Sequence, residues 1–183
     1  MITFEPLCHP LRKSLIKRCD QGRFFWELRS CIYWQEFEQP KIIYPDIAQK
    51  AEFSYDLDNL HLSNTLYLLP TKELWILGLL NSQLIFWVYN SISPQIRGGF
   101  LRFIAQYVSQ IPIIEATESQ RTAIEKLVKK CLAAKKSDPN ADTSELEKQI
   151  DHLVYKLYQL TYNEVKIIDP EFALTEQEYL DLP

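Results

Sequence analysis

The chain has few of the residues from which many enzyme sites are built, with only four glycines and three histidines among its 183 residues. It contains no Gly-x-Gly-x-x-Gly turn, no P-loop and no Gly-x-Ser-x-Gly nucleophile elbow. Its histidines lie far apart and lack the spacing of metal ligands. We therefore expect no cofactor and no metal ion, and we expect the chain to be non-catalytic by itself.

Cysteine is sparse as well. The four cysteines include no Cys-x-x-Cys pair, and the sequence lacks the pattern of a secretory signal. This usage is typical of reduced thiols, so we expect a cytoplasmic protein rather than a disulfide framework.

Charged residues are missing from residues 74–96, a stretch long enough to raise the question of a membrane span. The polar residues Asn81, Ser82 and Gln83 interrupt the stretch near its middle, and neither flank has a cluster of basic residues. We therefore predict a helix from Leu74 to Tyr89 that is buried in a protein core, and no membrane partner.

Apolar residues, in contrast, are plentiful: they make up 46% of the chain, which is ample for a packed core. The charge is unevenly distributed. Residues 1–110 contain 11 Lys and Arg against 10 Asp and Glu, whereas residues 111–183 contain 9 against 14. Because local potential decides whether phosphate is attracted, a net charge of −4 does not exclude binding to DNA.

The first part of the chain has the pattern of a mixed α and β domain. Aromatic and β-branched residues typical of strands occur at 25–33, 41–44 and 65–69, and prolines bracket the second stretch. We predict an α+β domain over residues 1–112.

The second part has the pattern of helices. Thr117–Gln120 and Ser144–Glu147 have the sequence of capping boxes and predict where two helices begin. Apolar residues then follow at steps of four and three, the spacing of a coiled-coil seam: Leu146, Ile150, Leu153, Leu157 and Leu160. We predict an antiparallel α-helical hairpin over residues 113–168, followed by an acidic tail over 169–183.

Two uses of this seam remain open. It serves either ordinary packing within the chain or the binding of a partner, including an oligomer formed through the hairpin. The partner-binding candidates are Leu146, Ile150, Leu153 and Leu157.

Two islands combine basic and aromatic residues: Arg23–Arg29, with the sequence RFFWELR, and Arg97–Phe103, with the sequence RGGFLRF. Glycine permits a tight turn or a close approach of backbone to a ligand. Arginine offers a planar fork of donors that suits phosphates and guanine edges. Both islands are candidate DNA contacts, and the alternative for each is a solvated charge or a surface salt bridge.

A metal-dependent nuclease is a further hypothesis. Pro45-Asp46 and the later Glu164-Val165-Lys166 have the residue types of such a site, in which two carboxylates hold Mg²⁺ beside a lysine. The long separation speaks against it, and we expect Asp46 to hold the turn that follows Pro45 instead.

Several short blocks, taken in order, resemble the TaqI-like C-terminal specificity domain. That family supplies target recognition to adenine-specific DNA methyltransferases and fused restriction-modification enzymes. The blocks are WELR at 26–29, KIIYPDIA at 41–48, NTLY at 64–67, LGLLNS at 77–82, RGGF at 97–100 continuing to Tyr107, and QIP at 110–112. Residues 146–158 resemble the helix that commonly follows, so the likeness extends over roughly residues 23–168.

The resemblance implies a target-recognition domain over residues 1–112, incomplete at its N-terminus, that reads DNA in a restriction-modification or phage-defence system. The implied partners are double-stranded DNA and an adenine-specific methyltransferase or endonuclease domain or subunit, which would flip out the target base. The methyltransferase motif of the Asn-Pro-Pro-Tyr type is absent from this chain. The candidate DNA contacts are Arg97, Gly98, Gly99 and Arg102, with Arg23, Arg29 and Lys41 as a second set.

Overall fold

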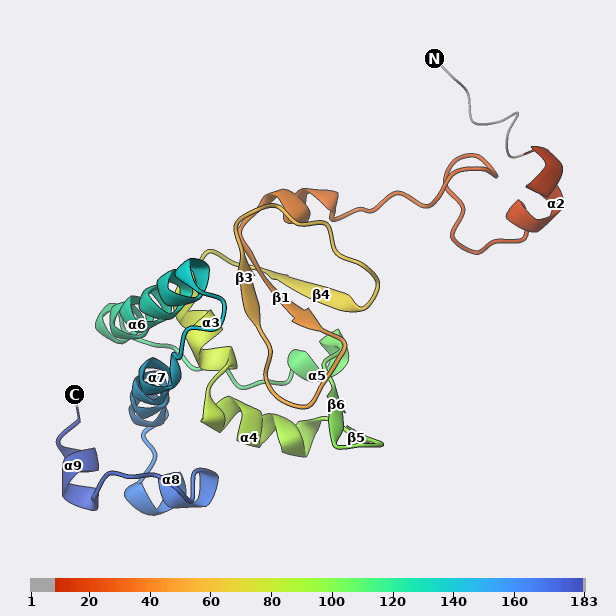
Figure 1. The fold of residues 1–183 in the computed structure, drawn as a ribbon. Helices are drawn as coiled ribbons and strands as arrows, with labels where there is room; N and C mark the ends of the chain where they lie inside the picture. Colours follow the sequence, from red (N-terminus) through yellow and green to blue (C-terminus); the bar gives the residue numbers. More distant parts are fainter. Residues whose placement is uncertain (1–8, 183) are drawn as a thin grey trace. The chain divides into compact units, whose positions relative to one another are not determined.

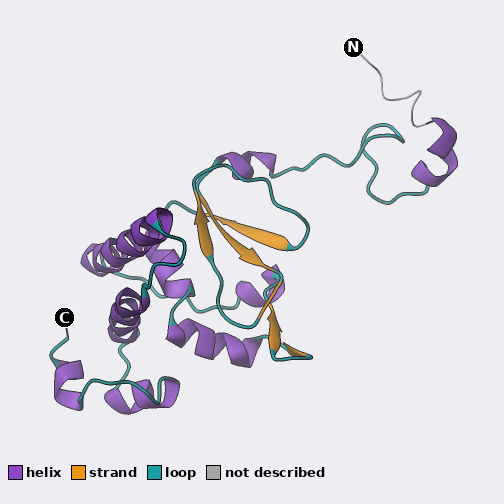
Figure 2. Ribbon diagram, in the orientation of Figure 1, coloured by secondary structure: helices purple, strands orange, loops and turns teal. Residues whose placement is uncertain are grey.

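The computed structural model describes residues 9–182. The chain divides into two compact units, Met1–Gln35 and Glu36–Pro183, and each is described by itself. Helices and short antiparallel strands occur together, so the expected α+β fold is confirmed (Figure 2). Whether residues 1–112, 113–168 and 169–183 are separate domains stays a prediction.

The smaller unit contains the 3-10 helix η1 (His9–Leu11), the short helix α2 (Arg12–Leu15) and a tight loop. The amide of Gly22 donates to the carbonyl of Glu27 at 3.0 Å, and the amide of Arg29 donates to the carbonyl of Asp20 at 2.7 Å. The strand predicted over residues 25–33 is wrong, because the loop folds back on itself with a single isolated bridge between Gln21 and Leu28.

The larger unit contains two three-stranded sheets, and η2 (Trp34–Glu38) spans the boundary between the units. We call the sheet with the order β3-β1-β4 the large sheet and the sheet with the order β2-β6-β5 the small sheet (Figure 1). The large sheet consists of β1 (Lys41–Pro45), β3 (Ser54–Asp56) and β4 (Leu66–Pro70). The small sheet consists of β2 (Ile47–Ala48), β5 (Gln95–Ile96) and β6 (Phe100–Arg102). All strand pairs are antiparallel.

Asp46 connects the two sheets, because it is the one residue between β1 and β2. Its amide donates to the carbonyl of Thr65 at 2.9 Å, beside the large sheet, and its carbonyl accepts from the amide of Phe103 at 2.7 Å, beside the small sheet. The backbone of Asp46 therefore fixes the position at which the small sheet begins.

The single helix predicted over residues 74–89 is wrong, because the structure has two: α3 (Leu74–Leu80) and α4 (Gln83–Ile92). Ser82 is the N-cap of α4 and accepts a hydrogen bond from the amide of Ile85 at 3.3 Å. The side chain of Asn81 bonds the amide and the carbonyl of Phe53, at 3.1 and 2.9 Å. The break is thus stabilised by a cap and by a contact distant in sequence. Among residues 9–182 no helix has the length and apolarity needed to span a membrane.

The remaining helices are α5 (Ala105–Val108), α6 (Glu118–Ser137), α7 (Ser144–Leu157), α8 (Tyr162–Ile168) and α9 (Glu176–Leu180). The capping box at Thr117 and Gln120 is confirmed. The one predicted at Ser144 is wrong: Thr143 is the N-cap residue of α7, and its hydroxyl donates to Glu147 at 2.6 Å.

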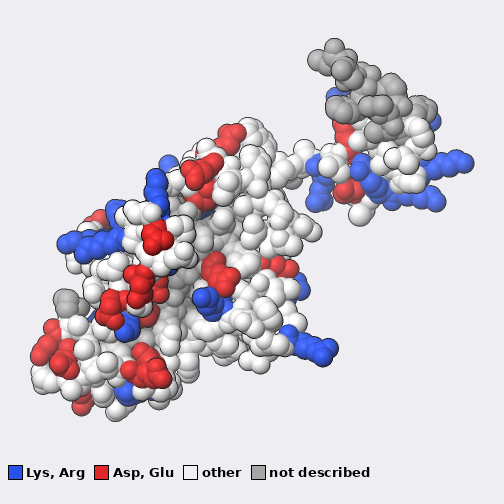
Figure 3. Space-filling view, viewed as in Figure 1, with Lys and Arg blue, Asp and Glu red and all other residues white. Residues whose placement is uncertain are grey.

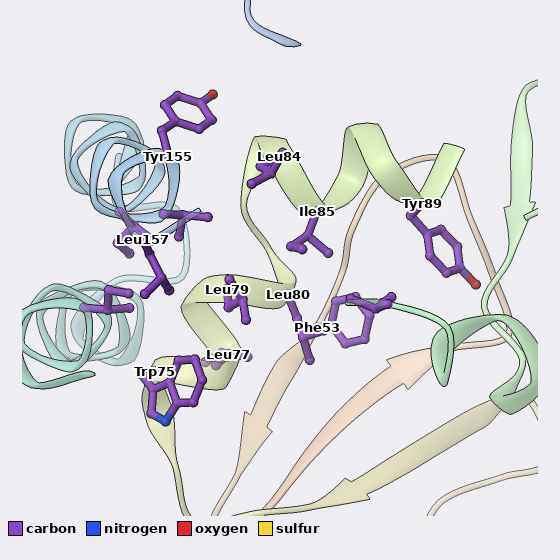
Figure 4. Close-up of a cluster of buried hydrophobic side chains, with 14 of the residues drawn as sticks. Phe53, Trp75, Leu77, Leu79, Leu80, Leu84, Ile85, Tyr89, Tyr155 and Leu157 are labelled. Atoms are coloured by element: carbon purple, nitrogen blue, oxygen red, sulfur yellow. The ribbon is translucent and has the colours of Figure 1, made fainter. Parts of the chain in front are cut away.

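The core lies where α3, α4, α6 and α7 meet the large sheet (Figure 4). Gly78 of α3 permits a close approach of the helices, because a Cβ there would lie 2.8 Å from Val128 and 2.9 Å from Ile124, both on α6. The helical second half therefore packs directly on the first half of the larger unit.

Candidate nucleic-acid interface

The turn between β5 and β6 presents Arg97. Ile96 pairs with Phe100, so the turn consists of three residues, Arg97, Gly98 and Gly99. The two glycines have φ of 90° and 77°, values that side chains disfavour. Gln49 donates from Nε2 to the carbonyl of Gly98 at 3.1 Å, which ties the turn to the end of β2. An exposed arginine is thus carried on a turn whose backbone is held in place.

Arg102 lies on β6 and forms an ion pair with Asp46, with 3.3 Å between Nε and Oδ1. The side chain of Arg102 is 39% exposed and that of Asp46 is 24% exposed. The ion pair is made through Nε, and among the described residues no hydrogen bond or ion pair uses the two terminal nitrogens, which remain as donors. Arg102 is therefore oriented by an acid while its donors still reach solvent.

The backbone under Arg102 is fixed by two polar side chains. The hydroxyl of Tyr89 donates to the carbonyl of Arg102 at 2.6 Å, and the amide of Arg102 donates to Ser93 Oγ at 3.0 Å. Burial raises the pKa of Tyr89, so its phenol remains a donor. The ring of Tyr89 stacks on buried Phe103 with 4.5 Å between centroids. The small sheet is thereby anchored to α4, and Phe103 is a core residue rather than a contact.

The structure removes Lys41 from the predicted DNA contacts. Its side chain is fully buried, where its ammonium pairs with Asp56 and donates to the carbonyl of Phe37 at 2.7 Å. Burial alone would raise the pKa of Asp56, but hydrogen bonds from Lys41 and from two backbone amides bring it below its ordinary value. An ammonium held by a buried carboxylate is not presented to a ligand, so Lys41 belongs to the fold.

Arg23 and Arg29 lie in the smaller unit, and both are exposed. The guanidinium of Arg23 lies over the ring of Phe24, 5.5 Å from its centroid, and that ring stacks on Trp26 at 4.8 Å. Arg23 and Arg29 thus lie in one loop of the smaller unit, whereas Arg97 and Arg102 belong to the larger unit.

Other basic residues of the smaller unit were not among the predicted contacts, although the sequence from Arg12 to Arg29 contains six Lys and Arg against two acids. Arg12, Lys13 and Lys17 are exposed on and beside α2. In contrast, Arg18 donates to the carbonyl of Glu27 at 2.7 Å and holds the loop. Several Lys and Arg side chains lie at the visible surface of this unit beside acidic and uncharged ones, whereas acidic side chains are frequent over α7, α8 and α9 (Figure 3). The density of basic residues between Arg12 and Arg29 was the signal in the sequence.

The predicted partner-binding seam is used inside the chain. Ile150 and Leu157 are buried, and Leu146 and Leu153 are half-buried. A Cβ on Gly78 would lie 3.4 Å from Ile150, so α7 contacts α3 directly. Ile150, Leu153 and Leu157 therefore pack within the chain, in or against its core.

The groups of the nuclease hypothesis have other partners. Asp46 pairs with Arg102, Glu164 forms a capping box with Thr161, and Lys166 donates to the carbonyls of Pro170 and Phe172 at 2.8 and 3.1 Å. Among the described residues no group of three or more His, Cys, Asp or Glu is placed to hold a metal ion. The geometry offers no support for this hypothesis.

Comparison with known proteins points to one family. The model of the TaqI-like C-terminal specificity domain matches residues 14–113, just over half of the chain. The Type II methyltransferase M.XhoI of Xanthomonas vasicola is 35% identical over 86 residues, which cover 45% of this chain and 16% of that protein.

A solved structure shares the fold. The Type IIL restriction-modification enzyme MmeI, determined in complex with DNA, matches with a TM-score of 0.65 and 19% identity. The match covers 97% of this chain and 26% of that enzyme. The chain therefore spans about a quarter or less of the length of these two proteins.

Proposed function

The chain belongs to the family of TaqI-like C-terminal specificity domains, and from this premise we propose that it recognises a DNA sequence on behalf of an adenine-specific methyltransferase or a fused restriction-modification enzyme. The observation that carries the proposal is the small sheet, on which a fixed turn presents Arg97 and an aspartate orients Arg102. The fork of arginine suits the O6 and N7 acceptors of guanine in the major groove, which admits a two-stranded ribbon.

The contacts divide into two kinds in this proposal. Arg97 and Arg102, on the small sheet, read base edges, with Gly98 and Gly99 allowing the backbone to come close. Arg23 and Arg29, together with Arg12, Lys13 and Lys17 of the smaller unit, contact phosphates. Phosphate contacts position a protein on the duplex, whereas base contacts specify the sequence.

The chemistry is left to another domain or subunit. This part of the proposal is supported by the family, which is one of specificity domains. We propose that the catalytic partner methylates adenine or cuts DNA, in the cytoplasm, as part of phage defence. A protein-interaction role of the α6–α7 hairpin has less support, since the seam packs within the chain.

The test is selection from a randomised duplex library at low salt, with the chain alone and together with a cognate adenine-specific methyltransferase, if one is encoded nearby. We expect enrichment of one short motif. The variant Arg97→Ala with Arg102→Gln is expected to lose the enrichment, because it removes both proposed base contacts while leaving the proposed phosphate contacts of the smaller unit in place.

Lys148→Ala is the matched control, because Lys148 is a 64% exposed cation of the acidic helical half. It is expected to select the same motif as the unmodified chain. Absence of enrichment in both arms of the selection would refute the proposed function.

A further inference from the structure

The small sheet has one face toward the core and one toward solvent. Residues paired across antiparallel strands share a face, and neighbours along a strand alternate. Leu101 and its partner Ala48 are 2% and 4% exposed, so they mark the inner face. The opposite face carries Ile47, Ile96, Phe100 and Arg102. We call these four residues the outer face of the small sheet.

The outer face is apolar and open. Ile47 is 45% exposed, Phe100 is 37% exposed, and the side chain of Arg102 is 39% exposed. In the core, comparable residues are closed off, as Phe103 and Leu101 are at 2%. This face of the small sheet therefore offers an isoleucine, a phenylalanine and an arginine together to a ligand.

The charges beside this apolar surface favour DNA as its occupant. Residues 95–102 and β2 contain two arginines and no acid. Asp46, the acid next to β2, is already paired with Arg102. A positive, partly apolar ribbon complements a polyanion that also has an apolar group in its groove. In the major groove that group is the C5 methyl of thymine.

Arg102 lies next to the apolar residues of the outer face, so a charged group and an apolar group are available at one place. Its Nε forms an ion pair with Asp46, and along β6 Phe100 lies two residues away on the same face. A guanidinium fork and an aromatic ring are thereby presented side by side, at the spacing of alternate strand residues. These are the groups that recognise guanine and thymine respectively.

We propose that the outer face of the small sheet reads a thymine methyl group beside a guanine, with Phe100 and Ile47 against the methyl group and Arg102 at the guanine edge. This assignment rests on the proposed function and names the base-pair class that the same site recognises. It predicts that a methyl group, rather than hydrogen bonding alone, contributes to the affinity.

The experiment uses the full chain and the motif obtained by selection, with each thymine of that motif replaced in turn by deoxyuridine, which lacks the C5 methyl. At one position or more we expect affinity to fall about fourfold, the equivalent of one buried methyl group at about 0.8 kcal/mol. In Phe100→Ala or Ile47→Ala the uracil and thymine duplexes are expected to bind equally.

Ile113→Ala is the matched control, because Ile113 is also 45% exposed but lies outside the small sheet. It should retain the preference for thymine. Both Phe100→Ala and Ile47→Ala are measured, and thermal unfolding checks that each is folded. If one variant is unfolded, the preference of the other for thymine over uracil tests the assignment.

The outcomes separate the two claims. A selected motif without thymine, no uracil effect at any thymine, or a uracil effect that persists in both variants would overturn the assignment while leaving DNA recognition intact. A library that yields no motif, alone or with the methyltransferase, would instead refute the proposed function.

Discussion

The two sheets of the larger unit each place a basic side chain beside an aspartate, and the two pairs differ in nearly every physical respect. In the large sheet, Lys41 faces Asp56 across β1 and β3 with 0% and 2% of the side chains exposed. In the small sheet, Arg102 meets Asp46 with 39% and 24% exposed. The first pair is sealed within the protein, and the second lies at its surface.

The difference shows that residue type alone does not distinguish a structural cation from a binding one. A buried charge must be neutralised and hydrogen-bonded, and Lys41 is held by Asp56 and by the carbonyl of Phe37. A half-exposed pair contributes little stability, because water competes for both charges. The small sheet can thus release the fork of Arg102 to a ligand, whereas the large sheet cannot release Lys41.

The largest expected effect follows from breaking the buried pair. Lys41→Met leaves Asp56 charged and unpaired, so the free energy of unfolding should fall by about 3–5 kcal/mol. For a chain of this size that corresponds to a drop in Tm of roughly 6–20 °C, measured by thermal unfolding. Adding Asp56→Asn should recover part of the loss, since it removes the unpaired charge and keeps one side-chain oxygen as an acceptor for one of the two amides, of Asp58 and Leu60, that Asp56 bonds. An unchanged Tm with weakened DNA binding would instead make Lys41 a contact.

The corresponding change in the small sheet should act on binding. Arg102→Gln is expected to weaken affinity for the selected duplex about 5- to 150-fold, the loss of one bidentate base contact of about 1–3 kcal/mol. Its effect on the free energy of unfolding should stay within about 1 kcal/mol, since the pair is only half-buried and water reaches part of both side chains. Titration of a labelled duplex and thermal unfolding measure the two quantities. A larger loss of stability than of affinity would show that the Arg102–Asp46 pair, like the Lys41–Asp56 pair, serves the fold rather than DNA binding.

Asp151 is a third aspartate to compare with Asp56 and Asp46. It is half-buried, and in the described residues it forms no salt bridge with a basic side chain. It accepts a hydrogen bond from the amide of Gln83 at 2.8 Å, and burial raises its pKa from 3.8 to about 7, with further contributions from Asp169 and Glu147. The folded chain holds this proton more tightly than the unfolded chain. Stability from this group is therefore fully present below about pH 4 and is lost as the pH rises toward 7.

The variant Asp151→Asn tests whether the charged form of Asp151 lowers stability as the pH rises. Asparagine keeps an acceptor for Gln83 but has no charge to desolvate, so at pH 8 the variant should be more stable by about 1 kcal/mol, or about 2–4 °C in Tm. At pH 4 the two proteins should unfold at nearly the same temperature. Parallel Tm curves from pH 4 to 8 would show that Asp151 titrates as an ordinary surface carboxyl.

Local signals in the sequence predicted the elements whose causes are local. Strands at 41–44 and 65–69 were marked by branched residues and prolines, and the cap at Thr117 by its capping box. The turn at Gly98 was marked by the glycine pair. The polar residues at 81–83 were noted, but they were not taken as a break between two helices, because the hydrogen bonds from Asn81 to Phe53 that also stabilise it join residues distant in sequence.

The errors at Lys41 and Ile47 of the candidate site also arise from contacts between residues distant in sequence. Lys41 was taken for a contact because its burial depends on pairing with Asp56, which only the register of β1 and β3 reveals. Ile47 was not singled out because its place beside Arg102 depends on the pairing of β2 with β6. Tertiary pairing, rather than residue type, decides which side of the sheet each residue takes.

The most direct test of the account is Arg97→Ala, with Tm and affinity for the selected duplex measured on the same sample. The account predicts a Tm within about 1–2 °C of the unmodified chain, because the side chain is exposed, together with affinity at least about 5-fold weaker. A fall in Tm of many degrees with unchanged affinity per folded molecule would contradict it, because Arg97 would then belong to the fold and the small sheet would lose its principal reader of DNA.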